Sequence, residues 1–175
     1  STGKEYDVSL RMVSAKLDIE LVEVADWICC GASAAHNTSP LTAVALPLQN
    51  LNLIAEQGFQ EVIVPCAACF SRFKSAQYEV HHDPELPPKL EKVLKQFRNE
   101  TKVTHPLEIF RQEEVTNRAV KLKTKDLSQL RVVCYYGCLL TRPPKVMQFD
   151  NGEHPQTMDK ILQDLGMTTL AWNYQ

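Results

Sequence analysis

Six cysteines are the residues of this 175-residue chain whose type and spacing could do chemistry. Cys29 and Cys30 are adjacent, and Cys66 and Cys69 have the CxxC spacing that is typical of metal ligands and redox pairs. Adjacent cysteines rarely allow the relaxed geometry of a disulfide, so we favour metal or redox chemistry over a disulfide framework. The remaining two cysteines are Cys134 and Cys138.

The composition indicates a globular protein and argues against two function classes. Apolar residues make up 44% of the chain, charged residues 23%, and the formal net charge is −2. This balance, without a stripe of Lys and Arg, argues against nucleic-acid binding. No apolar run reaches the roughly 18 residues of a membrane span, and no signal peptide opens the chain. We therefore expect a cytoplasmic protein with no membrane span.

The elements that position the cysteines alternate between strands and helices. We expect strands at 19–24, 59–64, 103, 131–136 and 168–172, and helices at 4–16, from 40, 66–78, 89–97, 107–115 and 157–165. The long helix that starts at Pro40 has Ser39 as its N-cap; Pro47 should kink or split it, and Gly58 should end it. This alternation predicts an α/β fold, with a parallel sheet flanked by helices.

The expected topology gathers the thiols. In parallel α/β sheets, ligands bind beyond the carboxyl ends of the strands. The Cys29–Cys30 pair, the CxxC motif of residues 66–69 and Cys138 each follow an expected strand, so four or five thiols should converge at one end of the sheet or its neighbour. A CxxC motif at a helix N-terminus also places its sulfurs near unpaired backbone N–H groups, which lower thiolate pKa values.

Two segments resemble each other and predict an internal repeat. Residues 17–27 and 165–175 both read as a helix end, a strand and a loop that contains an aromatic residue. The Cys29–Cys30 pair comes two residues after Trp27 in the first copy. Coincidence between two ordinary αβ units is the alternative explanation.

The spacing of the cysteines resembles a known family. The pair Cys29–Cys30, followed by Gly31 and then by CxxC at residues 66–69, resembles the cysteine-rich CCG domain. The text YYGCLLTRP at residues 135–143 resembles the start of the second CCG unit in the B-type subunit of heterodisulfide reductase. The resemblance implies a first unit over 1–118 that lacks its leading Cys, a connector at 119–130 and the beginning of a second unit at 131–175, so we expect a fragment truncated at both ends.

The resemblance also implies a cofactor and a reaction. Proteins of this family carry noncubane [4Fe-4S] clusters on CCG cysteines and reduce disulfides in one-electron steps, fed by flavin-containing and ferredoxin-like subunits. Carried over by motif, the ligands of the first cluster are Cys29, Cys30, Cys66 and Cys69, and Cys138 is the first ligand of the second. We expect an oxidoreductase subunit whose catalytic residues are unknown, and a fragment that is inactive by itself and holds zinc or no metal.

Two other functions remain open. The CCG motif also occurs in iron–sulfur subunits of lactate and glycolate dehydrogenases, which would make this an electron-transfer subunit without its own substrate site. Four thiolates also suit tetrahedral zinc and a zinc-stabilised interaction domain, although adjacent cysteines are awkward zinc ligands. Cys66 and Cys69 taken alone would also fit a thioredoxin-like pair or two core thiols.

Several other residues are candidates for the surroundings of the site. Cys134, inside an expected strand, is predicted to be a small buried hydrophobe. Trp27 and Trp172 are predicted to lie in the core or to shield a cluster. Arg142 fits either charge balance at a cluster or a surface turn, and His36 fits either a sulfur partner or a polar residue at a helix start. Four histidines in Pro-rich turns are predicted to face solvent: His81, His82, His105 and His154.

Overall fold

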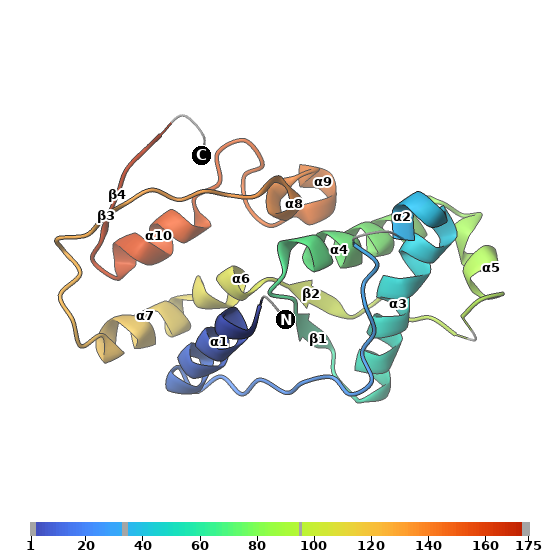
Figure 1. The fold of residues 1–175 in the computed structure, drawn as a ribbon, viewed down its shortest axis with the longest axis horizontal. Helices are drawn as coiled ribbons and strands as arrows, with labels where there is room; N and C mark the ends of the chain where they lie inside the picture. Colours follow the sequence, from blue (N-terminus) through green and yellow to red (C-terminus); the bar gives the residue numbers. More distant parts are fainter. Residues whose placement is uncertain (1–2, 33–34, 95, 173–175) are drawn as a thin grey trace.

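The computed structural model describes residues 3–32, 35–94 and 96–172, and Figure 1 shows helices arranged around two small sheets. In chain order, the elements are α1 (Lys4–Lys16), α2 (Ala35–Thr38), α3 (Pro40–Glu56), β1 (Glu61–Ile63), α4 (Ala67–His82), α5 (Leu86–Leu90), β2 (Lys102–Thr104), α6 (Pro106–Phe110), α7 (Glu113–Leu122), β3 (Arg131–Val132), α8 (Cys138–Thr141), α9 (Pro144–Met147), α10 (Thr157–Asp164) and β4 (Thr168–Thr169).

The strands pair in parallel, as predicted, but the prediction of one sheet is wrong. Within the described ranges, β1 pairs only with β2 and β3 only with β4, over three and two residue pairs. The predicted strand at 19–24 forms no ladder, so nothing widens the first sheet. Because each sheet stops at two strands, the protein is mostly helical, and its core lies between helices.

Helix α3 is continuous through Pro47, so of the two predicted effects of this proline the split is wrong. The Ser39 side chain accepts a hydrogen bond from the Thr42 N–H at 3.3 Å, which confirms the predicted N-cap. Proline has no N–H, so Pro47 leaves the carbonyl of Ala43 without its partner four residues on. Arg72 of α4 supplies a replacement, because its Nη2 donates to the Ala43 carbonyl at 3.4 Å. A side chain from the neighbouring helix thus takes over the missing bond.

The segment before the first cysteine pair is held by side-chain amides. Asn50 on α3 accepts from the Ile28 N–H at 2.8 Å and donates to the Ile28 carbonyl at 2.9 Å. Two helical turns further on, Gln57 makes the same pair of bonds with Ala25, at 3.0 and 3.1 Å. These amides pair with the backbone of the segment as a neighbouring strand would, so its path along α3 needs no sheet.

We expect Asn50→Ala to loosen this segment. Asn50 is buried, and its loss leaves the N–H and the carbonyl of Ile28 unpaired, so the free energy of unfolding should fall by about 1–3 kcal/mol. Urea denaturation measures this change, and amide hydrogen exchange at Ile28 should become faster. Gln57→Ala is the matched control: it removes the exposed version of the same contact and should cost less. Equal losses in the two variants would contradict this account.

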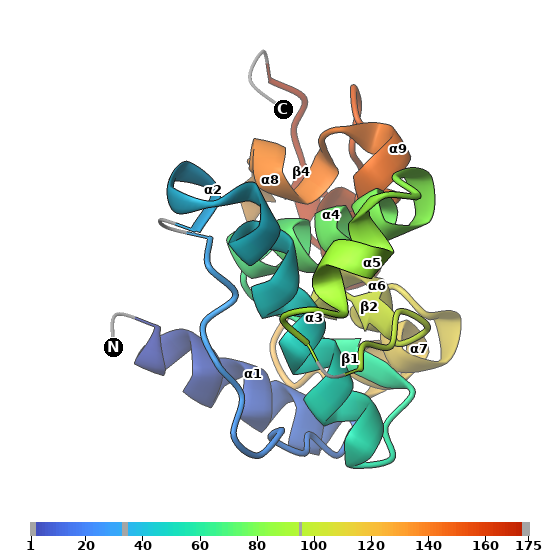
Figure 2. The same cartoon turned by 90° about the vertical axis from the view of Figure 1, so that its right-hand side faces the viewer.

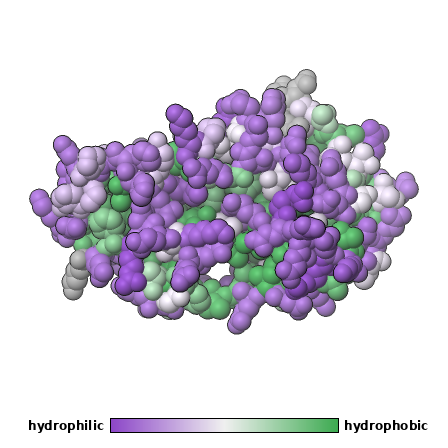
Figure 3. Space-filling view, turned by 180° about the vertical axis from the view of Figure 1, so that it is seen from behind, coloured by the Kyte–Doolittle hydropathy of each residue, from purple (hydrophilic) through white to green (hydrophobic). Residues whose placement is uncertain are grey.

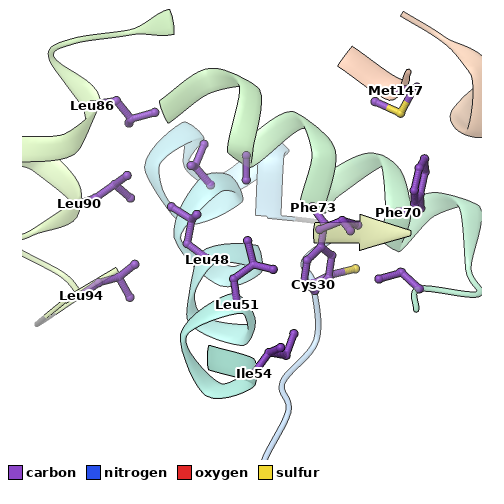
Figure 4. Packing of buried hydrophobic residues seen from close by; sticks show 14 of the residues in the cluster. Cys30, Leu48, Leu51, Ile54, Phe70, Phe73, Leu86, Leu90, Leu94 and Met147 are labelled. Atoms are coloured by element: carbon purple, nitrogen blue, oxygen red, sulfur yellow. The ribbon is translucent and has the colours of Figure 1, made fainter. Parts of the chain in front are cut away.

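The core lies between α3, α4 and α5 and continues to α8 and α9 (Figure 4). Its largest buried apolar side chains include Leu48, Leu51, Phe70, Leu90 and Met147. Figure 2 shows α8 and α9 on the opposite side of the molecule from α1, and both helices pack against α4. The helix that begins with Cys138 therefore rests on the helix that contains Cys69.

Helix α1 has the predicted bounds and lies at the edge of the molecule (Figures 1 and 2). It is held at its C-terminal end, where Arg118 of α7 donates to the Leu17 carbonyl at 2.6 Å and pairs with Asp18 at 3.2 Å. Large apolar side chains on α1, such as Met12, stay exposed. Figure 3 shows apolar side chains reaching the surface between polar ones on the face seen from behind.

Other predicted elements differ in length from those observed. The helix expected at 89–97 is the short α5, and the one expected at 107–115 is divided between α6 and α7. The strands expected at 131–136 and 168–172 shorten to two residues each, whereas the helix expected at 157–165 is confirmed by α10. Residues 173–175 of the second repeat copy lie outside the described residues. No described helix has both the length and the apolar character needed to cross a membrane.

Candidate functional site

The N-terminus of α4 positions the CxxC motif, as predicted. Pro65 follows β1, and Cys66 is the N-cap of the helix, with extended backbone angles. Cys69 lies within the first turn of α4, half-buried, whereas the Cys66 side chain is exposed. The first backbone N–H groups of a helix have no partner within it, so the motif meets the positive end of the helix dipole.

Gly31 allows the Cys29–Cys30 pair to approach helix α4. Its φ is +75°, and a Cβ atom at this position would lie 2.7 Å from the Cβ of Ala35 and 2.9 Å from a methyl of Leu46. Only glycine accepts both the left-handed backbone and the close approach. The turn leaves Cys29 exposed and buries Cys30, which belongs to the same buried cluster as Phe73 (Figure 4).

Cys30 and Cys69 are brought together from segments 39 residues apart. Their sulfurs are 2.9 Å from each other. The hydrogen bond between the two thiols lowers the pKa of Cys30 to about 6, despite partial burial. The same bond, followed by burial, raises the pKa of Cys69. The two pKa values therefore move apart, and the Cys30 sulfur is the one that loses its proton more readily.

The other candidate ligands are Cys29, Cys66 and Cys138. Cys66 is close enough for its charge to raise the pKa of Cys69 further. The sulfur of Cys29 accepts the Gly31 N–H at 3.4 Å, and Cys138 is exposed at the first position of α8. Within residues 3–32, 35–94 and 96–172, no three Cys, His, Asp or Glu side chains surround a common point. The structure thus brings one pair into contact and places Cys66 beside it.

Arg72 is a residue of the site that the sequence analysis missed. It follows Cys69 by three residues on α4, and residues with this spacing share one face of a helix. Its positive charge contributes to the low pKa of Cys30, after the larger effects of Cys69 and of the backbone. The signal was the spacing CxxCxxR. An arginine after a CxxC motif indicates a role at the site only when the positions of the other thiols in the fold are known.

His105 was predicted to face solvent, and this is wrong, since only 7% of it is exposed. It is the N-cap of α6: its Nδ1 accepts from the Leu107 N–H at 3.4 Å, and Glu108 accepts from the His105 N–H at 2.7 Å. Its ring meets that of Phe70 edge-on at 5.8 Å. The spacing of His105 and Glu108 is that of a capping box, which the sequence analysis did not consider.

Burial of His105 makes the stability of the protein depend on pH. Burial lowers its pKa from 6.5 to about 4, while a hydrogen bond with the Pro65 backbone acts in the opposite direction. Between these two pH values the unfolded chain binds a proton at His105 and the folded chain does not, so stability should fall as the pH falls through this window, by up to about 3 kcal/mol. Above pH 6.5 this contribution is constant.

Urea denaturation at several pH values measures this dependence. His105→Gln should flatten the slope between pH 6.5 and pH 4, whatever its effect on stability at neutral pH. His154→Gln, which changes an exposed histidine, is the matched control and should leave the slope unchanged. The account of His105 is wrong if its replacement leaves the slope as steep as before.

The second half of the chain has a buried thiol of its own. Cys134 is buried, as predicted, and burial followed by the charge of Asp159 raises its pKa to about 11. The indole N–H of Trp172 donates to the Cys134 carbonyl at 2.8 Å. Cys134 is therefore protonated at neutral pH, in contrast to Cys30.

The remaining candidates from the sequence lie outside the thiol pair. Trp27 is 60% exposed and donates to Glu23 at 3.3 Å, so the prediction of a core role is wrong. Arg142 is exposed and pairs with Glu153 at 3.2 Å, in line with the surface-turn alternative. His81 and His82 belong to the last turn of α4 rather than to a loop. The side chain of His36 lies outside the described part of the chain.

Comparisons with known proteins give one matching family model and several relatives. The family model of the cysteine-rich CCG domain matches residues 2–74. The 8-methylmenaquinol:fumarate reductase membrane anchor subunit of Wolinella succinogenes is 31% identical over 164 residues, which cover 93% of this chain and 57% of that protein. The B-type subunit of the ferredoxin/F(420)H(2)-dependent CoB-CoM heterodisulfide reductase of Methanosarcina acetivorans is 25% identical over 167 residues, 93% of this chain and 55% of that protein.

The B-type subunit of the ferredoxin:CoB-CoM heterodisulfide reductase of Methanosarcina mazei gives the same identity and coverage. This chain thus spans a little over half the length of these curated relatives. All three are subunits of oxidoreductases by name. The chain contains a cysteine-rich CCG domain and is a distant homologue of the B-type subunit of heterodisulfide reductase and of the fumarate reductase anchor subunit.

Proposed function

We propose that this chain is part of an iron–sulfur electron-transfer subunit of a heterodisulfide reductase-like oxidoreductase. The observation that carries the proposal is the contact of Cys30 and Cys69, 2.9 Å apart, in a region that also contains Cys29 and Cys66. Thiolate sulfur is the protein ligand of iron–sulfur clusters. Two sulfurs in contact, with two exposed cysteines in the same region, fit this use better than they fit the packing of a core.

The donor set fits a cluster of the [4Fe-4S] type. In this proposal the first cluster binds to Cys29, Cys30, Cys66 and Cys69, and Cys138 is a ligand of a second cluster. When bound, the cluster supplies one-electron redox chemistry. The chain itself holds the thiols: Gly31 brings Cys30 against α4, and the Asn50 amide fixes the backbone before Cys29.

The proposed chain organisation follows the repeat. We assign residues 1–118 to the first CCG unit, 119–130 to a connector and 131–175 to the second unit. Helix α7 ends at Leu122, inside the connector, and β3 begins at Arg131, where the second unit starts. Helices α8 and α9 pack on α4, so the helix that begins with Cys138 lies against the helix that contains Cys69. This packing supports electron transfer between the sites of the two units.

The electron partners and the acceptor come from the resemblance. Flavin-containing and ferredoxin-like subunits would deliver electrons, and the acceptor would be a disulfide, as the name of the Methanosarcina relatives indicates. Two electrons and two protons convert a disulfide to two thiols, so a subunit that passes single electrons must act twice in each turnover.

Anaerobic reconstitution with ferrous iron and sulfide tests the proposal. The complete subunit should take up iron and inorganic sulfide in equal amounts and give a paramagnetic signal on oxidation. Zinc offered in the same experiment should not displace the iron. Stoichiometric zinc without iron uptake would overturn the proposal in favour of the zinc-stabilised interaction domain.

A second candidate is an electron-transfer subunit without a disulfide site. The similarity to the fumarate reductase subunit favours it, because that identity is 31%, against 25% for the Methanosarcina relatives. The two candidates share the iron–sulfur site and differ in the acceptor. Reduction of the CoB-CoM heterodisulfide by the assembled complex would select the first candidate, and electron transfer only to a quinone or flavin would select the second.

A further inference from the structure

A half-buried arginine joins helix α4 to the helix that packs beside it. Arg72 lies on α4, one turn after Cys69, and its Nη2 donates to the Ala43 carbonyl of α3 at 3.4 Å. Among the described residues its Nε is fully buried and has no hydrogen-bond partner. An arginine normally has all its buried N–H groups paired, because each unpaired one has a desolvation cost. The guanidinium is thus placed but not satisfied by the chain.

The structural explanation for Arg72 accounts for only one of its donors. Pro47 leaves the Ala43 carbonyl free, and one Nη2 hydrogen bond repairs that defect. A hydrogen bond to a carbonyl needs one donor and no charge, and a charge held away from water has a cost. The unpartnered Nε and the full positive charge therefore need a second explanation, and Cys69 of the proposed site lies one turn earlier on the same helix.

We propose that Arg72 supplies the positive charge that balances the metal-bound thiolates of Cys30 and Cys69. Helix α4 carries both Cys69 and Arg72 on one face, and the Ala43 carbonyl holds the guanidinium in place from the opposite helix. This inference rests on the proposed function, since the anion that Arg72 balances is the set of metal-bound thiolates. Arg72 is a positioning residue, and it stabilises bound metal without being a ligand.

Charge balance predicts two measurable effects in the reconstituted protein. A nearby cation favours the more negative, reduced form of a redox centre, so Arg72→Gln should lower the reduction potential measured by anaerobic redox titration. It should also speed the release of iron to a chelator about tenfold or more, as losses of residues around a metal site usually do. Arg72→Lys keeps the charge, so its reduction potential should stay close to that of the unchanged protein.

Two further variants separate charge from packing. Lys74→Gln removes a positive charge from the same helix two residues away and should change neither the potential nor the rate of iron release. In the Arg72→Gln protein, a second change, Pro47→Ala, supplies the missing helix N–H for the Ala43 carbonyl. It should recover stability in urea without recovering iron retention, because it restores the hydrogen bond but not the charge.

Each outcome decides between the two roles of Arg72. If Arg72→Gln loses its iron, its reduction potential cannot be measured. Retention of iron by Arg72→Lys in that case still supports the charge role. Equal loss in both variants, or recovery of iron retention by Pro47→Ala, would make Arg72 a packing residue and overturn the inference. Equal potentials and equal iron release in all variants would overturn it alone, whereas an unchanged protein that takes up no iron would overturn the proposed function as well.

Discussion

Replacing either Cys30 or Cys69 with alanine should remove most of the iron that the protein takes up on reconstitution. These two sulfurs are in contact, 2.9 Å apart, and both belong to the proposed ligand set of the first cluster. Loss of a residue that only surrounds a metal weakens binding by about 10–100-fold, so loss of a direct ligand should have an effect at least as large. Iron and inorganic sulfide, measured after gel filtration, report the result.

Cys134→Ala is the matched control for this experiment. Cys134 is 4% exposed and Cys30 is 5% exposed, so the two replacements remove the same atoms from equally buried positions. Cys134 is protonated and lies in the second half of the chain, and its replacement should leave the iron content unchanged. Circular dichroism checks that all three variants fold. Full iron content in both Cys30→Ala and Cys69→Ala would rule out the proposed ligand set.

Phe70→Ala should be the most destabilising single change in the core. Phe70 is fully buried, and its ring meets those of His105 and Phe149 edge-on at 5.8 and 6.3 Å. His105 and Phe149 also meet edge-on, at 5.7 Å. Truncation of a buried phenylalanine leaves a cavity that costs about 3–5 kcal/mol of unfolding free energy. The three rings join α4, the start of α6 and the loop after α9, so the cavity would loosen all three.

Urea denaturation of Phe70→Ala measures this loss. Val22→Ala, in the exposed segment before Cys29, is the control and should change the free energy of unfolding by less than about 0.5 kcal/mol. Because Phe70 is next to Cys69, the variant should also release iron more readily. A loss of under about 1 kcal/mol would mean that the three rings are not packed as described.

Local signals in the sequence predicted the helices better than the sheets. Ser39 as N-cap and Gly58 as terminator predicted the two ends of α3 because both act through their own backbone neighbourhood. A strand needs a partner from elsewhere in the chain. The apolar and acidic alternation at 19–24 is typical of a strand, yet no other strand lies beside it among the described residues, and helix α3 holds the following residues instead.

The same contrast holds for the site. The types and spacing of the cysteines predicted which residues to consider, and the contact of Cys30 with Cys69 is of the kind expected. Arg72 and His105 were missed because their roles depend on contacts across the fold: one with the carbonyl freed by Pro47, the other with the ring of Phe70. Neither contact leaves a periodic pattern in the sequence.

The amide contacts along α3 have a consequence for how the site is inherited. A strand in a sheet is held by the main chain of its neighbour, which any residue type provides. The segment that leads to Cys29 is held by the side chains of Asn50 and Gln57. Each side chain both accepts from a backbone N–H and donates to the carbonyl of the same residue, which requires an amide group. The position of the first thiols therefore depends on residues some twenty to thirty positions further along the chain. A single nucleotide change in the codon of Asn50 or Gln57 can shift these thiols although every cysteine is preserved.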